Sequence, residues 1–227
     1  MRFRIFIALL LLPSLAFSGQ GMGPGPGVGK TYVGGGETLI AHIEGDEANG
    51  ASMLVGTGTI TSTAITAAFT EAVSGRGFVL IGPDRVSVSS ANINPNKFRV
   101  EFKFKDYTGS PAAYGKFFVV DADTTLQFAR NAADTAYNLT YNSVVVWSET
   151  AGTNLWDGTA RTISVELDNA TDSAIVKIDG ATITNDAGAV TWPTDIGATT
   201  TLLFGNRVDE ARYIGGLMGD IKVYALP

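Results

Sequence analysis

The segment FRVEFKFK at residues 98–105 constrains the fold of this chain more than any other. Its four apolar residues alternate with arginine, glutamate and lysine, so an extended strand carries the apolar side chains on one face and the charges on the other. Such a strand needs a dry layer on one side and water on the other. TISVEL at residues 162–167 alternates in the same way. The two segments together predict an antiparallel sheet with one buried face.

Short strand-like segments separated by turn residues fill most of the chain after residue 36. In AIVKIDGATIT at 174–184, Asp179-Gly180 stands between two apolar runs, which is typical of a tight hairpin turn. Residues 64–73, AITAAFTEAV, are ambiguous between helix and strand, and their β-branched content favours strand. The predicted fold class is all-β, an antiparallel β-sandwich. The expected strands are 38–44, 77–81, 85–89, 98–105, 114–121, 125–129, 137–141, 143–147, 162–167, 174–178, 200–205 and 217–226, with threonine-rich segments around 57–70.

The N-terminus has the pattern of an export signal. Residues 1–18, MRFRIFIALLLLPSLAFS, combine a basic start with a short apolar run that a proline interrupts, and Ala16 and Ser18 are the small residues of a cleavage site. The run is too short to span a bilayer comfortably, so we expect cleavage after Ser18 and no membrane span afterwards. Residues 19–36 are rich in glycine and proline and are predicted to be a leader or linker. Residues 37–227 are predicted to form one domain.

Charge and cysteine content narrow the partners and the compartment. The chain has 16 basic and 22 acidic residues, and loss of two arginines with the signal would leave a net charge of −8. An acidic surface repels phosphate backbones, which argues against nucleic acid as a partner. The chain has no cysteine, and a domain with a sizeable core needs no disulfide. We expect a secreted, periplasmic or cell-surface protein of bacterial type.

Four segments carry a resemblance to a known family through their order and spacing. They are LIAHIEGDEANGA at 39–51, KFRVEFKFK at 97–105, LWDGTARTISVELDNATDSAIVKIDGATI at 155–183 and LLFGNRVDEARYIGGLMGDIKVYALP at 202–227. Together they resemble the laminin G-like, concanavalin A-like jelly-roll family over about 190 residues, which implies a concanavalin A-like jelly roll. Family members often carry a Trp-His pair where this chain has Arg161-Thr162, which loosens the subfamily assignment and leaves the sandwich unaffected.

Jelly rolls of this kind also include glucanases and polysaccharide lyases, and neither residue set is complete here. Retaining glucanases use Glu-x-Asp-x-Glu because acid and nucleophile must face one cleft about 5.5 Å apart. ELD at 166–168 begins that pattern, but no second glutamate follows. RVEFK at 99–103 resembles one lyase strand, whereas the partner motifs are missing and the only histidine is His42. We therefore expect no enzymatic activity.

Carbohydrate is the main binding hypothesis. Sugar sites pair a flat aromatic ring with a few polar groups, since C–H faces stack on rings while hydroxyls need hydrogen bonds. Trp156 with Asp157, in a loop rich in glycine, threonine and asparagine, is the main candidate, and Arg161 and Tyr213 are further candidates. For any single aromatic residue, packing in the core is the simpler interpretation.

Calcium is the one metal that the sequence suggests. Ca²⁺ takes six to eight oxygen ligands, commonly from loop carboxylates and carbonyls, and laminin G-like domains often hold it at the rim of the sandwich. Asp121, Asp123 and Asp134 lie in adjacent turns, and Asp209 lies in the variable loop before the last strand. These four are the predicted ligands. Solvated turn acids are the simpler interpretation.

The sequence as a whole predicts a secreted, non-catalytic recognition module that binds a glycan or a protein partner through the loops at the rim of its sandwich. The alternative is a structural subunit of a cell-surface, filament or virion-associated assembly, which low charge and the leader at 19–36 would suit. A polysaccharide-degrading enzyme is the third hypothesis.

Overall fold

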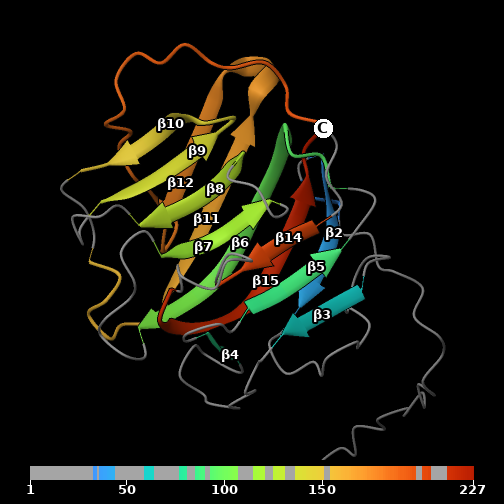
Figure 1. Ribbon diagram of the computed structural model, residues 1–227, viewed down its shortest axis with the longest axis vertical. Helices are drawn as coiled ribbons and strands as arrows, with labels where there is room; N and C mark the ends of the chain where they lie inside the picture. The colour runs from blue at the N-terminus through green and yellow to red at the C-terminus, as the bar shows by residue number, and fades with distance from the viewer. Residues whose placement is uncertain are drawn as a thin grey trace, which may run out of the picture.

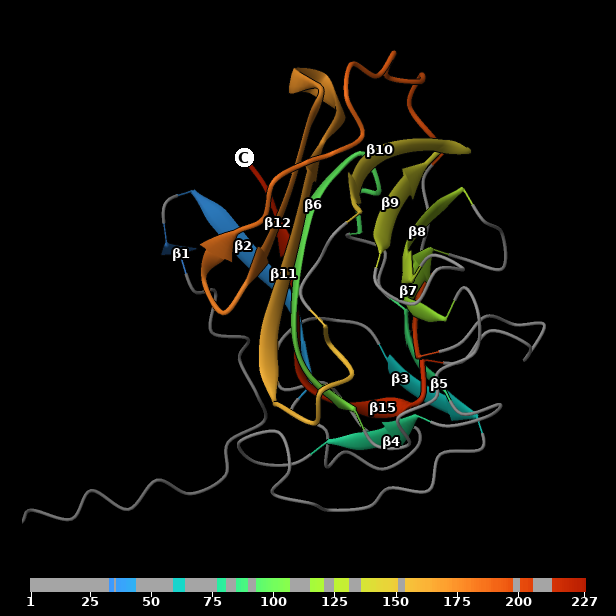
Figure 2. The same cartoon turned by 90° about the vertical axis from the view of Figure 1, so that its left-hand side faces the viewer.

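The computed structural model describes residues 33–34, 36–43, 59–63, 77–80, 85–89, 93–106, 115–120, 125–130, 136–150, 154–197, 201–205 and 214–227. Within them the chain forms two antiparallel sheets that face each other, as the edge-on view in Figure 2 shows. The prediction of an antiparallel β-sandwich is confirmed. No helix in these residues is long and apolar enough to cross a membrane.

The sheet that contains both the first and the last strands is called sheet A, and its partner is called sheet B (Figure 1). Sheet A has the order β1 (Val33–Gly34), β2 (Glu37–Ile43), β15 (Gly216–Ala225), β6 (Lys97–Asp106), β11 (Arg161–Asp168), β12 (Ser173–Ile178) and β13 (Ala181–Thr182), with β4 (Phe78–Leu80) paired to β15. Sheet B has the order β10 (Val144–Glu149), β9 (Tyr137–Tyr141), β8 (Leu126–Arg130), β7 (Lys116–Val120), β14 (Thr201–Phe204), β5 (Arg85–Ser89) and β3 (Thr59–Thr63).

Strand β6 lies at the centre of sheet A and fixes its two faces. Its residues alternate between buried and half-buried along the strand, as the sequence predicted, and β11 pairs with it so that Val165 lies opposite Val100. On the other side, β15 pairs with β6 through a bulge between Gly219 and Lys222. The bulge contains Asp220 in the left-handed region, at φ 47°, so that both Met218 and Ile221 reach the core.

Aromatic side chains from both sheets form the centre of the core. Phe117 of β7 is fully buried, and removing such a ring from water contributes about 1.5–3 kcal/mol. Its centroid lies 5.1 Å from that of Phe104, in edge-to-face geometry, and 5.2 Å from that of Phe128. Phe102, Tyr137 and Trp156 complete its ring contacts.

Predicted strands differ from the observed ones mainly by one or two residues at their ends. β10 continues to Glu149, beyond the predicted end at residue 147, because its pairing with β9 extends to Tyr137. The predicted Asp179-Gly180 turn is confirmed, since both residues have positive φ, 51° and 82°. The signal at residues 1–18, nearly all of the leader and the ambiguous 64–73 lie outside the described residues.

The chain returns from β13 in sheet A to β14 in sheet B through a long connection, described as far as residue 197, that passes over the top of the molecule in Figure 1. Val190, Trp192 and Ile196 pack from it against the core. Asparagine side chains fasten it to the rest of the sandwich. The pairs are Asn96 with Ile196, Asn142 with Thr194, Asn169 with Pro193, and Asn185 with Val146 and Ser148.

Candidate functional site at one rim of the sandwich

Three neighbouring strands of sheet B place polar residues side by side at one rim of the sandwich. In the register of β8, β9 and β10, Arg130 lies opposite Tyr137 and Tyr137 lies opposite Glu149. All three are buried, with exposed fractions of 6%, 1% and 7%. Opposed residues of antiparallel strands share a face, so the three side chains project together between the sheets.

The Tyr137 hydroxyl connects this row to the next loop. Its oxygen accepts a hydrogen bond from the backbone N–H of Leu155 at 3.1 Å. Burial raises the pKa of Tyr137 to about 12, although the Leu155 bond acts in the opposite direction, and the Glu149 carboxylate raises it further. The guanidinium groups of Arg130 and Arg161 lower this pKa, so both act on the same hydroxyl. The hydroxyl is therefore a neutral, structural group at physiological pH.

Trp156 covers this row from the loop that follows β10. Its indole stacks on Tyr137, with centroids 5.8 Å apart and planes at 13°, and contacts Phe104 and Phe117. The Arg130 guanidinium lies 5.0 Å from the ring centroid, within range of a cation–π interaction. The indole Nε1–H donates to the carbonyl of Ile214 at 3.4 Å. The structure thus gives Trp156 a packing role, and its sugar-stacking role stays a prediction.

Asp157 and Arg161, both predicted as ligand-binding residues, are brought together. The Arg161 guanidinium donates to Asp157 Oδ2 at 2.7 Å and to Asp179 Oδ2 at 3.5 Å. Hydrogen bonds from the backbone N–H of Thr159 and from Arg161 lower the pKa of the Asp157 carboxyl. Asp179 also accepts from the backbone N–H of Thr162 at 2.8 Å, which connects the β12–β13 turn to the start of β11. The cation is therefore shared between two carboxylates.

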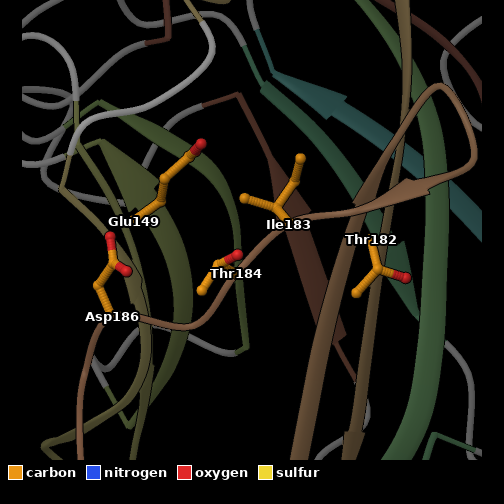
Figure 3. Close-up of a pocket in the computed structure, with 5 residues that line it drawn as sticks. All are labelled: Glu149, Thr182, Ile183, Thr184 and Asp186. Atoms are coloured by element: carbon orange, nitrogen blue, oxygen red, sulfur yellow. The ribbon is translucent and has the colours of Figure 1, made fainter.

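A pocket of about 330 Å³ opens beside this rim, between the end of β10 and the residues that follow β12 (Figure 3). In Figure 3, Thr182 and Ile183 come from the side of sheet A, while Glu149 stands on β10 and Asp186 lies next to it. The fifth lining residue, Thr184, lies between them. The pocket therefore lies where the connection crosses from one sheet to the other.

Two adjacent residues bind the chain tightly to the edge of β10 at this pocket. Asn185 Oδ1 accepts from the backbone N–H of Ser148 at 3.1 Å, and its Nδ2 donates to the carbonyl of Val146 at 3.1 Å. The backbone N–H of Asp186 donates to the carbonyl of Ser148 at 2.7 Å. Asp186 Oδ2 accepts from both the backbone N–H and the hydroxyl of Thr150, at 3.0 and 2.8 Å. These bonds lower the pKa of the Asp186 carboxyl.

Sequence reasoning missed the residues that line this pocket. Thr182, Thr184 and Asp186 belong to TITND at 182–186, a run of oxygen-bearing side chains directly after the predicted hairpin. That run was the available signal. Of the predicted ligand-binding residues, Tyr213 lies outside the described residues. So do the predicted calcium ligands Asp121, Asp123, Asp134 and Asp209, and the calcium site stays a prediction.

Glu166 and Asp168, the two acids of the glucanase-like motif, contact other parts of the sandwich. Asp168 accepts from the backbone N–H of Ala170 at 3.0 Å as the N-cap of a short 3₁₀ turn, Asn169–Thr171, and lies 3.3 Å from the Lys97 ammonium. Glu166 lies opposite Arg99 of β6. Within the described part of the chain, no three His, Cys, Asp or Glu side chains are grouped to hold a metal ion.

The lyase-like residues belong to an ion-pair network on the outer face of sheet A. Arg99 donates to Glu37 and, at 3.2 Å, to Glu101. Asp220 in turn lies 3.4 Å from the Lys103 ammonium. His42, the only histidine of the chain, has its Nε2 2.8 Å from Asp220 Oδ1. The charged residues of the lyase-like motif are therefore engaged in ion pairs and hydrogen bonds with other side chains of sheet A.

No family model and no curated protein matches the sequence. The fold does match solved structures. Domain 4 of an extracellular GH43 arabinanase from Geobacillus stearothermophilus, solved with arabinotriose, has a TM-score of 0.56 and 17% identity over 82% of this chain and 92% of that domain. Trypanosoma rangeli sialidase with sialic acid has a TM-score of 0.57 and 10% identity, over 83% of this chain and 31% of the sialidase.

A structure of botulinum neurotoxin type C, described as depending on two ganglioside molecules for cell entry, has a TM-score of 0.58 and 11% identity over 83% of this chain and 48% of that one. At such identities the likeness establishes the fold alone. That fold is the antiparallel β-sandwich that the sequence predicted. The laminin G-like subfamily stays a prediction.

Proposed function

We propose that this chain is a secreted, non-catalytic recognition module that binds carbohydrate at one rim of its β-sandwich. The observation that carries the proposal is the match to domain 4 of the arabinanase, because this chain covers 92% of a separate domain that was solved with arabinotriose. This chain therefore resembles nearly the whole of a separate domain that was solved with a carbohydrate, and not only a part of a larger domain.

Two properties of the rim described above support the proposal. It is supported by a rigid base, because Trp156 stacks on Tyr137 and Leu155 is bonded to the same hydroxyl. It also presents exposed oxygen atoms, including those of Asp157 and Asp186, from segments that hydrogen bonds hold in place. A preordered polar surface loses little conformational entropy when it binds.

The absence of catalysis is part of the proposal and rests on how the acidic residues are used. Asp168 caps a turn and pairs with Lys97, and Glu101 pairs with Arg99. A retaining glucanase needs two carboxyl groups about 5–5.5 Å apart across one cleft. Release of reducing sugar from β-glucan or alginate, abolished by Glu101→Ala or Glu166→Ala, would overturn this part of the proposal.

A glycan array tests binding directly. We expect the purified chain to bind a defined group of oligosaccharides above the level of an unrelated β-sandwich, and the array is run both with and without a chelator. Loss of binding with chelator, restored by Ca²⁺, would support the predicted calcium site. No binding above the control in either condition would count against the proposal. Mass spectrometry of the exported protein, with Gly19 expected at its N-terminus, tests secretion.

Assembly into a cell-surface or filament structure remains the competing function. It predicts a chain that associates through its sandwich faces or edges. Sedimentation velocity at high protein concentration distinguishes the two, because a recognition module is expected to stay monomeric. Large oligomers together with a blank glycan array would favour assembly.

A further inference from the structure

We propose that the pocket lined by Glu149, Thr182, Ile183, Thr184 and Asp186 is a subsite for an uncharged sugar and excludes acidic sugars such as uronates and sialates. The inference rests on the proposed carbohydrate-binding function and names the ligand class and the residues. Its volume, about 330 Å³, is at the lower end of the ~300–1,000 Å³ range of small-molecule pockets. That size suits a short unit of a sugar chain.

Asp186 is held ready to accept hydrogen bonds from a ligand. Thr150 donates twice to Oδ2, so that oxygen anchors the side chain. Among the described residues, no protein group bonds to the second oxygen, Oδ1. The side chain is exposed, and its lowered pKa keeps the carboxylate ionised at neutral pH. A carboxylate fixed through one oxygen can accept a sugar hydroxyl at the other without losing further rotamer freedom.

The remaining lining residues suit the other parts of a sugar ring. Thr182 and Thr184 are both exposed, and within the described part of the chain neither hydroxyl has a protein partner. A hydroxyl both donates and accepts, as sugar hydroxyls do. Ile183 is half-buried and packs against the core, so it presents a fixed apolar surface to sugar C–H groups. The pocket thus alternates polar and apolar contacts over a short distance.

The charges at the pocket decide between neutral and acidic sugars. Two of its five lining residues are acids, Glu149 and Asp186, and none is Lys, Arg or His. Cations lie on neighbouring strands. Arg161 is shared by Asp157 and Asp179, Arg130 is buried in the same row as Glu149, and Lys177 lies opposite Thr182. A ligand carboxylate beside these two acids would be repelled, and more strongly near the protein surface than in bulk water because the effective dielectric constant is lower there. A neutral sugar would meet no such repulsion.

Asp186→Asn is the most informative substitution. The amide oxygen of asparagine can still accept both hydrogen bonds from Thr150. The second oxygen, Oδ1, is replaced by an NH₂ group, which donates hydrogen bonds and cannot accept them. Thr184→Val keeps the shape and removes the hydroxyl. Matched controls are Asp172→Asn and Thr171→Val, exposed residues at the opposite end of the β11–β12 hairpin. Thermal melting shows whether each variant is folded.

The probes are arabinotriose, galactotriose and trigalacturonate, measured by calorimetry against the purified chain after the glycan array. The last two are of equal length and differ in the carboxylate at C6. We expect at least a tenfold preference for galactotriose over trigalacturonate. Asp186→Asn should weaken binding of the neutral sugar about tenfold and reduce the preference, while Thr184→Val weakens binding alone and the controls match the wild type.

Other outcomes separate the two proposals. If the array finds neutral ligands but the pocket variants bind them as the wild type does, the pocket inference is overturned and carbohydrate binding stands. A wild-type preference for trigalacturonate or sialylated glycans also overturns the inference alone. If no glycan binds, the proposed function fails and the inference fails with it.

Discussion

Asn96 holds both backbone groups of Ile196, a residue one hundred positions further along the chain. Its Nδ2 donates to the Ile196 carbonyl at 3.1 Å, and its Oδ1 accepts from the Ile196 N–H at 2.9 Å. Tyr141 also donates its hydroxyl to Asn96 Oδ1. One amide side chain therefore joins the turn before β6, the end of β9 and the long connection between the sheets.

Asn96→Ala should lower the free energy of unfolding by about 2–3 kcal/mol, because it leaves the Ile196 carbonyl without its donor and the hydroxyl of buried Tyr141 without its acceptor. The Ile196 N–H keeps the Tyr141 oxygen, 3.2 Å away, as a partner. Asn142→Gly is the matched control, since glycine accepts the left-handed backbone of position 142, at φ 45°, and the substitution removes one exposed bond to Thr194, so that it should cost less than about 1 kcal/mol. Urea denaturation measures both. Equal losses in the two variants would show that Asn96 does not organise this junction.

The sequence predicted the sheets well because burial in strands depends on local alternation. The pattern at residues 98–105 defines one dry face wherever the strand lies, and the structure confirms it in β6. The anchoring by Asn96 has no local signature, since its partner is so distant in the chain. The same holds for the pocket, where Glu149 and Thr184 meet only after the chain has crossed from one sheet to the other.

Trp156 shows why site prediction was harder than fold prediction. A tryptophan beside an aspartate in a polar loop is compatible with a sugar platform and with a packing residue, and the two differ only in what covers the ring. Here Tyr137, Phe104 and Phe117 contact the ring, and the residue is half-buried. Which rings meet depends on the register of the opposite sheet, and alternation within one strand carries no information about that register.

Asn185→Ala should both destabilise the sandwich and expose the edge of β10. The substitution removes the bonds to the Val146 carbonyl and the Ser148 N–H, at a cost of about 1–2 kcal/mol. Unpaired edge groups favour strand pairing with a second molecule, and Val145 on the same strand is already 38% exposed. We expect more self-association by light scattering. Asn185→Asp, which keeps the acceptor, should lie between the variant and the wild type.

Asp220→Asn should lower the free energy of unfolding at neutral pH. It should also make that free energy fall less steeply as the pH is lowered. Burial opposes ionisation of Asp220, but hydrogen bonds from Lys222 and His42 outweigh it, so its pKa lies below the usual value. A lowered carboxyl pKa stabilises the fold above the unfolded pKa, and this contribution disappears as the pH falls through the folded pKa.

Asparagine tolerates the left-handed backbone at position 220, so the substitution tests charge and not strain. The expected loss at pH 7 is about 1–2 kcal/mol, reduced by partial exposure to solvent. Chemical denaturation between pH 2 and pH 7 measures it. A wild-type pH profile that the variant reproduces unchanged would contradict the role of Asp220.

Tyr137→Phe tests the buried hydroxyl at the rim through alkaline pH. Burial raises the pKa of Tyr137 to about 12, above an unfolded value near 10. The folded state therefore holds this proton more tightly than the unfolded state. The stabilisation is complete below pH 10 and is lost as the pH rises towards 12, to a total of about 3 kcal/mol. Phenylalanine has no proton to lose, so the variant should show a shallower decline over this range.

At neutral pH the same substitution should cost about 1–2 kcal/mol, because the buried N–H of Leu155 loses its acceptor. Burial also raises the pKa of Tyr224, which lies on sheet A away from the rim, and Tyr224→Phe is the control for alkaline unfolding in general. Denaturation at pH 7 to 12 separates the effects. If Tyr137→Phe retains the full alkaline slope, its hydroxyl is not the group whose ionisation unfolds this end of the sandwich.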